Sequence, residues 1–486
     1  MDNKDCDDRI SKLPDAMIIH ILSFLPTEDV VRTCILSKRW KLIWYSVPTL
    51  FFPFSNVSSP NCDLSLDKFS NYVDNYLEHR KKGMHFSGIV SFKLDLMLIY
   101  REYNDSFADK WLAFAVKNKV KEIYLHIHMD QKSYERDFYY DYYYDGPNYI
   151  PHAPYYYLPK ILENVSYLTI LELNGVMLNT SYSYSFPCLK TLSLENIEPT
   201  SRGSERDNVD VVFRFLLGCP SLETFRLCSY FLLIDNPFGL ETLSLKFIEL
   251  IDVHYLGFLP KIEAINLESF VLVGAILDIV NLSNCKKITN LALSIMNNHI
   301  SSSLEALISN LPLLENLTLT YDDNFKLGTL RIWSQHLKSL KISTKINDVG
   351  MMKVTIESAP KLAYISYEGN TNFSISMESS NSLNGKIVIR WIEEQGDYNR
   401  NWFTNMRNFL VNLNCSWNIV TLHVPTYKAR IRPENLKKTC HYPLLNWKHL
   451  RVITDLKPER MYDLKDALLW ILPSLETLSI NGNDIF

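Results

Sequence analysis

The sequence has little of what enzymes and membrane proteins use to bind phosphates, metals or lipid. Only 15 of its 486 residues are glycine, and no G-x-G-x-x-G or G-x-x-x-x-G-K-[ST] phosphate-binding motif occurs. Neither H-E-x-x-H nor G-x-S-x-G is present. The longest apolar run, Phe270 to Leu277, is far too short to cross a bilayer. We therefore expect no catalytic residue, no cofactor and no membrane association.

An excess of positive charge and a cysteine framework are also missing. With 50 Lys and Arg against 54 Asp and Glu, the net charge of −4 provides no general field for binding nucleic acid. The nine cysteines form no C-x-x-C pair, and an odd number does not indicate a regular disulfide framework. The acidic N-terminus has no apolar segment of the kind that signal peptides carry. These absences predict a reducing compartment, the cytoplasm or the nucleus.

What the sequence does contain is a recurring apolar motif, Leu-x-x-Leu-x-Leu, in which other apolar residues can replace Leu. Six copies follow a proline, as in the copy from Pro187 to Leu194. From Leu168 to Leu362 most steps between copies are 18–26 residues, with one of 33, close to the period of leucine-rich repeats. The copies begin at Leu168, Leu189, Leu222, Leu240, Ile262, Ile288, Leu314, Leu337, Leu362 and Leu475, and weaker ones at Ile89, Val120, Ile419 and Trp447.

The spacing predicts how each unit folds. The last two apolar residues of the motif alternate with polar ones, as on a strand with one buried face. Helix-like stretches precede some strands, at 211–217, 304–311 and 464–472, and proline ends such a helix because it lacks a backbone donor. A single unit cannot bury its apolar face alone, so the units must stack. The predicted fold is α/β: a leucine-rich-repeat solenoid with a curved parallel sheet and helices on the convex side.

The polar positions between the buried ones are predicted to form a concave face that binds a target protein. They show no single charge sign that would identify this partner. The positions assigned by strand alternation are Ser193, Arg226, Ser244, Asn266, Thr318 and Lys341.

Residues 9–47 do not fit the repeat. Apolar residues from Ile18 to Leu25 recur at helical spacing, and Thr27 and Ser37 are predicted N-caps of two further short helices. A three-helix unit this small carries more apolar side chains than its core can bury, which favours a partner surface. The alternative is that this unit caps the repeats.

The same segment resembles an F-box. The resemblance rests on Leu13-Pro14-Asp15, Ile21 to Pro26, Val30 to Cys34, Leu36 to Trp40, and Trp44. Much of the remaining chain resembles the plant F-box proteins with leucine-rich repeats, for example at Val120 to Leu125 and Gly218 to Glu223. Because the chain stops at Phe486, soon after its last repeat, we expect no complete FBD segment of the kind many members carry.

The resemblance implies a non-catalytic substrate receptor of an SCF-type E3 ubiquitin ligase. In such families the F-box binds a Skp-family adaptor attached to a cullin scaffold, and the repeats hold the target protein. Trp40 is the expected anchor, with a role in the internal core as its alternative. The competing function is a leucine-rich-repeat scaffold outside any ligase. Carried over by motif position, the adaptor contacts would be Leu13, Pro14, Ile21, Leu25, Val30, Leu36 and Trp40.

These features divide the chain into an F-box at 9–47, a connector with irregular repeats at 48–120, and the repeats at 121–486. A Tyr-rich stretch at 134–157 is predicted to be an inserted loop, either for protein recognition or merely variable. The Ser- and Asn-rich residues 370–384 are also predicted to be a loop. His126 and His128 share a predicted strand face, but without a Cys or His cluster beside them we favour surface histidines over a metal site.

Overall fold

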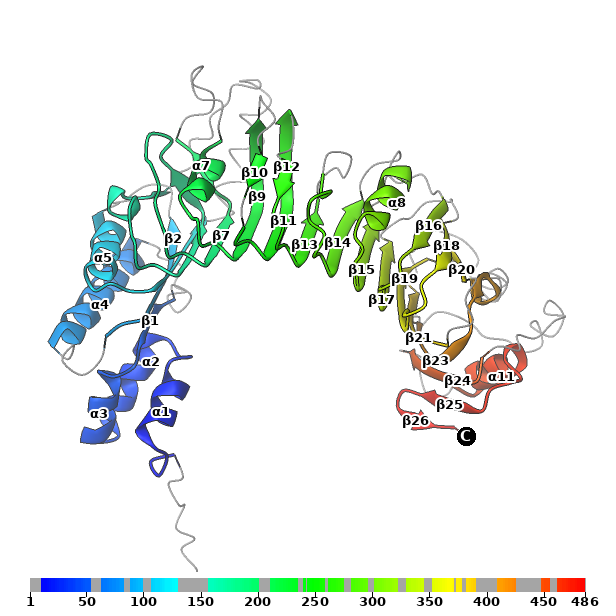
Figure 1. The fold of residues 1–486 in the computed structure, drawn as a ribbon. Coiled ribbons are helices and arrows are strands. Elements are labelled where there is room, and N and C mark those ends of the chain that lie inside the picture. The colour runs from blue at the N-terminus through cyan, green and yellow to red at the C-terminus, as the bar shows by residue number, and fades with distance from the viewer. Residues whose placement is uncertain are drawn as a thin grey trace, which may run out of the picture. The chain divides into compact units, whose positions relative to one another are not determined.

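The computed structural model describes residues 10–53, 63–82, 88–98, 106–129, 156–200, 210–234, 239–241, 243–257, 261–274, 281–295, 301–321, 329–344, 352–370, 373–377, 382–389, 409–424, 447–454 and 461–485. The chain forms two compact units, unit 1 (Met1–Asp235) and unit 2 (Asn236–Phe486). Parallel strands run through both units, with helices in some of the connecting segments (Figure 1), which confirms the mixed α/β class. Among the described residues, no helix combines the length and the apolar character needed to span a bilayer.

Unit 1 begins with short helices: α1 (Asp15–Leu22), α2 (Thr27–Arg32), the 3₁₀ turn η1 (Thr33–Ile35) and α3 (Lys38–Trp44). The Ser37 prediction is confirmed, because its hydroxyl accepts a hydrogen bond from the Trp40 amide nitrogen at 3.4 Å. The Thr27 prediction is wrong, since Pro26 precedes α2 as its cap. The Thr27 hydroxyl instead accepts from the Phe51 amide at 2.8 Å, which ties α2 to the first strand.

A parallel sheet follows in unit 1. Strands β1 (Thr49–Phe52), β2 (Ser91–Leu98), β3 (Glu122–Met129), β5 (Ile170–Asn174), β7 (Thr191–Glu195) and β9 (Thr224–Ile234) pair in chain order. Their register places one apolar residue of each strand in a single buried row: Leu50, Phe92, Ile123, Leu171, Leu192 and Phe225. The motif therefore sets the strand register, because a slip of one residue would expose the row.

The segments between these strands differ from one repeat to the next. They include helices α4 (Asp63–Lys82), α5 (Ser106–Lys117) and α7 (Val211–Leu217). Short strands β4 (Tyr156–Tyr157), β6 (Val176–Leu178) and β8 (Glu198–Pro199) form a second parallel ladder. Residues 134–155 of the predicted Tyr-rich insertion lie outside the described residues.

Unit 2 contains a longer parallel ladder. Its strands are β11 (Phe247–Gly257), β13 (Ser269–Val273), β14 (Asn290–Ile295), β15 (Asn316–Tyr321), β17 (Ser339–Thr344), β19 (Tyr364–Gly369), β21 (Leu383–Ile389), β23 (Trp417–Val424), β24 (His449–Thr454) and β25 (Thr477–Ile480). A short antiparallel strand, β26 (Asn483–Asp484), pairs with β25. Again one residue of each strand enters a shared buried row, as Leu317, Leu340 and Ile365 do.

Strands replace helices in several connecting segments of unit 2, so the prediction of helices there is only partly right. Helices α8 (Ser301–Ser309) and α11 (Met461–Ile471) are present, but β16 (Thr329–Trp333), β18 (Met352–Ser358), β20 (Phe373–Met377) and β22 (Leu413–Asn414) form a parallel ladder of their own. Strands β10 (Gly239–Glu241) and β12 (Lys261–Glu263) also pair. Leu330 and Ile332 are buried while Arg331 between them is exposed, which is the two-residue period of a strand. The predicted loop at 370–384 contains β20.

Three motif copies lie in a different frame from the predicted one. The predicted starts were Leu240, Ile262 and Ile419, but the first two copies begin five residues later and the third two residues earlier. Ile265, placed in the core by the predicted frame, is 49% exposed. Closely spaced apolar residues give overlapping Leu-x-x-Leu-x-Leu frames that the motif alone cannot rank. The buried triplets are Leu245, Ile248 and Leu250; Leu267, Phe270 and Leu272; and Trp417, Val420 and Leu422.

Candidate functional site

The helices of the N-terminal module enclose a small, complete core. Its members are at most 5% exposed: Ile18, Leu22, Val30, Trp40, Ile43 and Trp44. The Trp40 indole nitrogen donates to the Ser11 hydroxyl at 3.5 Å, so even its polar atom is satisfied within the module. Two predicted adaptor contacts, Val30 and Trp40, therefore lie in the interior. For Trp40 the structure favours the internal role that the sequence left open.

Many large apolar side chains of the module remain in contact with solvent. Their exposed fractions run from 38% for Leu25 to 90% for Ile35. Removing apolar surface from water contributes roughly 25 cal/mol of favourable free energy per Å². A module this small, with its core already filled, leaves these side chains in solvent, which makes them candidate contacts for another protein. We call this set the apolar surface; it comprises Ile10, Met17, Ile21, Phe24, Leu25, Ile35, Leu36 and Leu42.

The predicted contacts divide between this surface and the core. Ile21, Leu25 and Leu36 belong to the apolar surface, Pro14 is exposed, and Leu13 is half-buried. Sequence reasoning missed several members of the surface, among them Met17, Phe24 and Ile35. Met17 lies one turn before Ile21 on α1, so counting at i, i+4 would have revealed a second apolar stripe beside the buried one.

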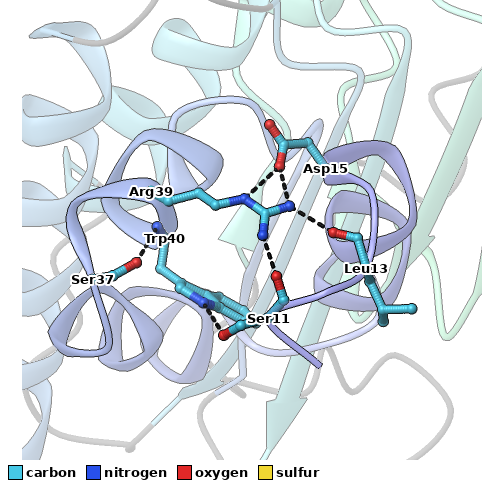
Figure 2. A network of polar contacts seen from close by, with 6 residues as sticks. All are labelled: Ser11, Leu13, Asp15, Ser37, Arg39 and Trp40. Atoms are coloured by element: carbon cyan, nitrogen blue, oxygen red, sulfur yellow. Dashed lines mark hydrogen bonds and ion pairs between the residues drawn. The ribbon is translucent and has the colours of Figure 1, made fainter. Parts of the chain in front are cut away.

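Arg39 of α3 fixes the segment that leads into α1 (Figure 2). Its Nε and Nη2 donate to Asp15 Oδ1 at 2.8 and 2.6 Å, and Nη2 also donates to the carbonyl oxygen of Leu13 at 2.6 Å. Its Nη1 donates to the carbonyl oxygen of Ser11. The planar fork of a guanidinium can hold several acceptors at once, so Arg39 positions Leu13 and Pro14 against α3.

A second polar cluster lies on the sheet of unit 1. The His126 ring on β3 stands between two carboxylates, with Nδ1 3.2 Å from Asp95 Oδ1 and Nε2 3.0 Å from Glu172 Oε1. These hydrogen bonds raise the pKa of His126 to about 9 and lower the pKa of Glu172. Asp95, His126 and His128 are close enough to share a metal ion. Without a metal, the two carboxylates hold the protonated ring of His126 through its two nitrogen atoms.

The predicted target-binding positions fall into two groups. Ser193, Arg226, Thr318 and Lys341 lie on strands β7, β9, β15 and β17, on the face opposite the buried row. Arg226 and Lys341 are exposed and Thr318 is half-buried, whereas Ser193 is only 8% exposed. Because of the frame error, Ser244 and Asn266 lie in the turns before β11 and β13 and not on strands.

The domain and the relatives that this chain matches all have F-box in their names. Residues 10–52 match the F-box domain. An F-box/FBD/LRR-repeat protein of Arabidopsis thaliana is 28% identical over 221 residues, which cover 45% of this chain and 41% of the relative. An F-box/LRR-repeat protein of the same plant is 28% identical over 247 residues, 51% of this chain and 68% of the relative. A putative F-box/FBD/LRR-repeat protein is 32% identical over 241 residues, 49% of this chain and 45% of the relative.

The match spans less than half the length of the first and third of these relatives. The names of these relatives nevertheless agree with the F-box motif of the sequence and with its recurring leucine-rich motif. The F-box domain at residues 10–52 and the names of the relatives together support the plant F-box/leucine-rich-repeat family for this chain, which confirms the resemblance found in the sequence.

Proposed function

We propose that this chain is the substrate-recognition subunit of an SCF-type E3 ubiquitin ligase. Its F-box would bind a Skp-family adaptor and, through it, a cullin scaffold, while the repeats bind a target protein. The observation that carries the proposal is the apolar surface on a module whose core is already complete. Burial of that surface against an adaptor would supply the driving force for assembly.

In this proposal the chain performs no bond chemistry. It raises the local concentration of target lysines near the ubiquitin-loaded enzyme, which converts a bimolecular encounter into an effectively intramolecular one. The parallel strands would be the repeats of a leucine-rich-repeat solenoid whose polar strand face selects the target. The division at 9–47, 48–120 and 121–486 and a location in the cytoplasm or nucleus belong to the same proposal.

Two matched substitutions test adaptor binding. Leu36 in the F-box and Leu217 in α7 are both 63% exposed, so Leu36→Glu and Leu217→Glu make the same chemical change at equal exposure. Calorimetric titration of the full chain with a purified Skp-family adaptor should show binding for the wild type and for Leu217→Glu. Leu36→Glu should weaken binding at least tenfold, because it places a charge in the desolvated interface.

The competing function, a leucine-rich-repeat scaffold outside any ligase, predicts no adaptor binding by the wild type. That result would overturn the ligase proposal even though the fold is correct. An equal loss of adaptor binding in Leu36→Glu and Leu217→Glu would also count against the ligase proposal, because binding would then not depend on the apolar surface. Circular dichroism of each variant separates lost binding from lost folding.

A further inference from the structure

A row of alternating hydroxyl and cationic side chains crosses the sheet of unit 2. Each member is the in-register partner of the next on the neighbouring parallel strand. All stand at strand positions between buried residues, and therefore on the face opposite the core. We call it the hydroxyl–cation row; it comprises Thr318, Lys341, Ser366, Lys386, Thr421, Arg451 and Ser479.

The three cations of the row are exposed. Among the residues that the structure describes, the side chains of Lys341, Lys386 and Arg451 take part in no hydrogen bond or ion pair. Cations just before the strands behave differently: Lys338 pairs with Glu315 at 2.7 Å, and Lys448 pairs with Glu476 at 2.9 Å. Carboxylates are therefore available near the sheet but are used outside the row.

Other charged groups on this face leave the row cationic. Glu368 follows Ser366 by two residues, and no other carboxylate stands on this face of strands β17 to β24. His423 and His449 lie on the same face beside the row, two residues from Thr421 and Arg451 respectively. Asp484 pairs with Ser479 at the end of the row. On this face, strands β17 to β24 therefore carry three permanent positive charges and one carboxylate.

We propose that the hydroxyl–cation row binds an extended segment of a partner protein that is rich in Asp and Glu. This inference rests on the proposed function, because the partner would be the target of the ligase. Neighbouring strands are about 4.8 Å apart, so cations on alternate strands are separated by about 10 Å. An extended polyproline II segment has three residues per turn and rises about 3.1 Å per residue, so its every third side chain faces the same way at intervals of about 9 Å. Acidic residues at every third position of such a segment match the spacing of the cations.

Each part of the row has a distinct task in this binding mode. Lys341 and Lys386 attract carboxylates as point charges, and Arg451 can bind one through two parallel hydrogen bonds. The hydroxyls of Ser366 and Thr421, between the cations, can donate to or accept from the backbone of the segment. The partner would therefore lie across the strands, with its chain running along the row.

A single-stranded nucleic acid fits the row less well. The row carries no aromatic side chain on which bases could stack.

Fluorescence anisotropy with labelled peptides and the full chain tests the inference. One peptide carries Asp at every third position, a second carries the same residues with the Asp clustered, and a third has Asn in place of Asp. The spaced peptide should bind best, and its binding should weaken with salt. Combined Lys341→Gln, Lys386→Gln and Arg451→Gln should weaken its binding about tenfold or more. Ser366→Asp should also weaken it, by placing a competing carboxylate between two cations.

The matched control removes three exposed cations elsewhere, through Lys117→Gln, Lys353→Gln and Lys361→Gln. This control should leave peptide binding unchanged. Equal loss in the two triple variants, equal binding of spaced and clustered peptides, or tighter binding of a single-stranded oligonucleotide would each overturn the inference. If the wild type captures the adaptor but no peptide, the row inference alone fails. If it binds the spaced peptide but no adaptor, the ligase proposal fails.

Discussion

The guanidinium of Arg80 in the last turn of α4 is hydrogen-bonded to the end of α3, where its Nη1 donates to the carbonyl oxygen of Trp44 at 3.0 Å. Its Nη2 donates to the carbonyl oxygen of Val47 at 2.7 Å, and its charge lies over the Trp44 ring, 5.4 Å from the centroid. Arg80 is 0% exposed, and burial lowers its pKa to about 10, so it is still charged at neutral pH. The last carbonyl groups of a helix have no hydrogen-bond donor within the helix. Arg80 supplies such donors at the end of α3.

Replacing Arg80 should therefore destabilise the module strongly. Arg80→Met keeps much of the side-chain length but leaves the carbonyl oxygen of Val47 without its donor, while that of Trp44 keeps only the Val47 amide as a donor. The expected cost is about 2–3 kcal/mol in the free energy of unfolding. Urea unfolding followed by circular dichroism measures this. The control is Lys110→Met, which removes the exposed ion pair with Asp74 and should cost at most about 1 kcal/mol. Similar losses in the two variants would contradict the role given to Arg80.

Trp40→Ala should act through folding and not through a lost contact. The Trp40 side chain is 5% exposed, and truncating a buried aromatic side chain to Ala typically costs about 3–5 kcal/mol. Adaptor binding should fall in proportion to the unfolded fraction of the module and recover when the temperature is lowered. Leu36→Glu serves as the control, since it should lose adaptor binding at every temperature while the module stays folded. Trp40→Ala protein that is fully folded and yet does not bind would restore Trp40 as a direct contact.

The stability of unit 1 should depend on the protonation of His126. Its pKa is raised from 6.5 to about 9 in the folded state, so its stabilising contribution is fully present below pH 6.5 and is lost as pH rises through 9. The His126 side chain is 29% exposed, and after allowance for solvent screening the contribution is about 1–3 kcal/mol. Glu172, whose pKa is lowered, contributes above its unfolded value and does not change in this window. The difference in unfolding free energy between wild type and His126→Gln should shrink between pH 6 and pH 9.5, and an unchanged difference would exclude the charged pairings.

Much of the sheet could be predicted because the motif has one periodic frame at most repeats. Leu317 and Leu340, for example, are in-register neighbours, as the spacing from Leu314 and Leu337 implies. At Leu240 and Ile262 the apolar residues are so closely spaced that a second frame competes, and only burial in the sheet decides. The connecting strands were missed for a different reason: alternation over the five residues of β16 is too short to stand out beside the longer repeat.

The candidate site was predictable as a segment but not residue by residue. Ile18 and Ile21 are both apolar and lie on one short helix, yet the first is 1% and the second 48% exposed. Helical spacing defines a stripe, but which side of the stripe faces the module's own core depends on how α1 packs against the other helices. Trp40 was placed among the predicted contacts by its motif position, which does not tell whether a side chain faces the core or a partner. Two members of the hydroxyl–cation row, Thr318 and Lys341, were predicted as target-binding positions. The whole row was not, because strands such as β21 carry no recognisable motif copy.

Gly385 explains why the β21 copy is hidden, and it supports a last prediction. In the buried row between Ile365 and Val420, Gly385 occupies the place of an apolar side chain, and a Cβ there would lie 2.7 Å from Cζ3 of Trp417. The Trp417 ring thus fills the space that leucine fills in other repeats.

Gly385→Leu alone should destabilise unit 2 by about 1–3 kcal/mol through overpacking, and Trp417→Ala alone should destabilise it by about 3–5 kcal/mol through a cavity. The double variant should lose clearly less unfolding free energy than the two single variants together, because the new leucine enters the space that the ring has left. A double-mutant cycle from urea unfolding measures this coupling. Gly88→Leu is the control, since a Cβ at Gly88 meets nothing within 4 Å, and it should cost little. Simple additivity of the two substitutions would show that the ring does not stand in for the missing leucine.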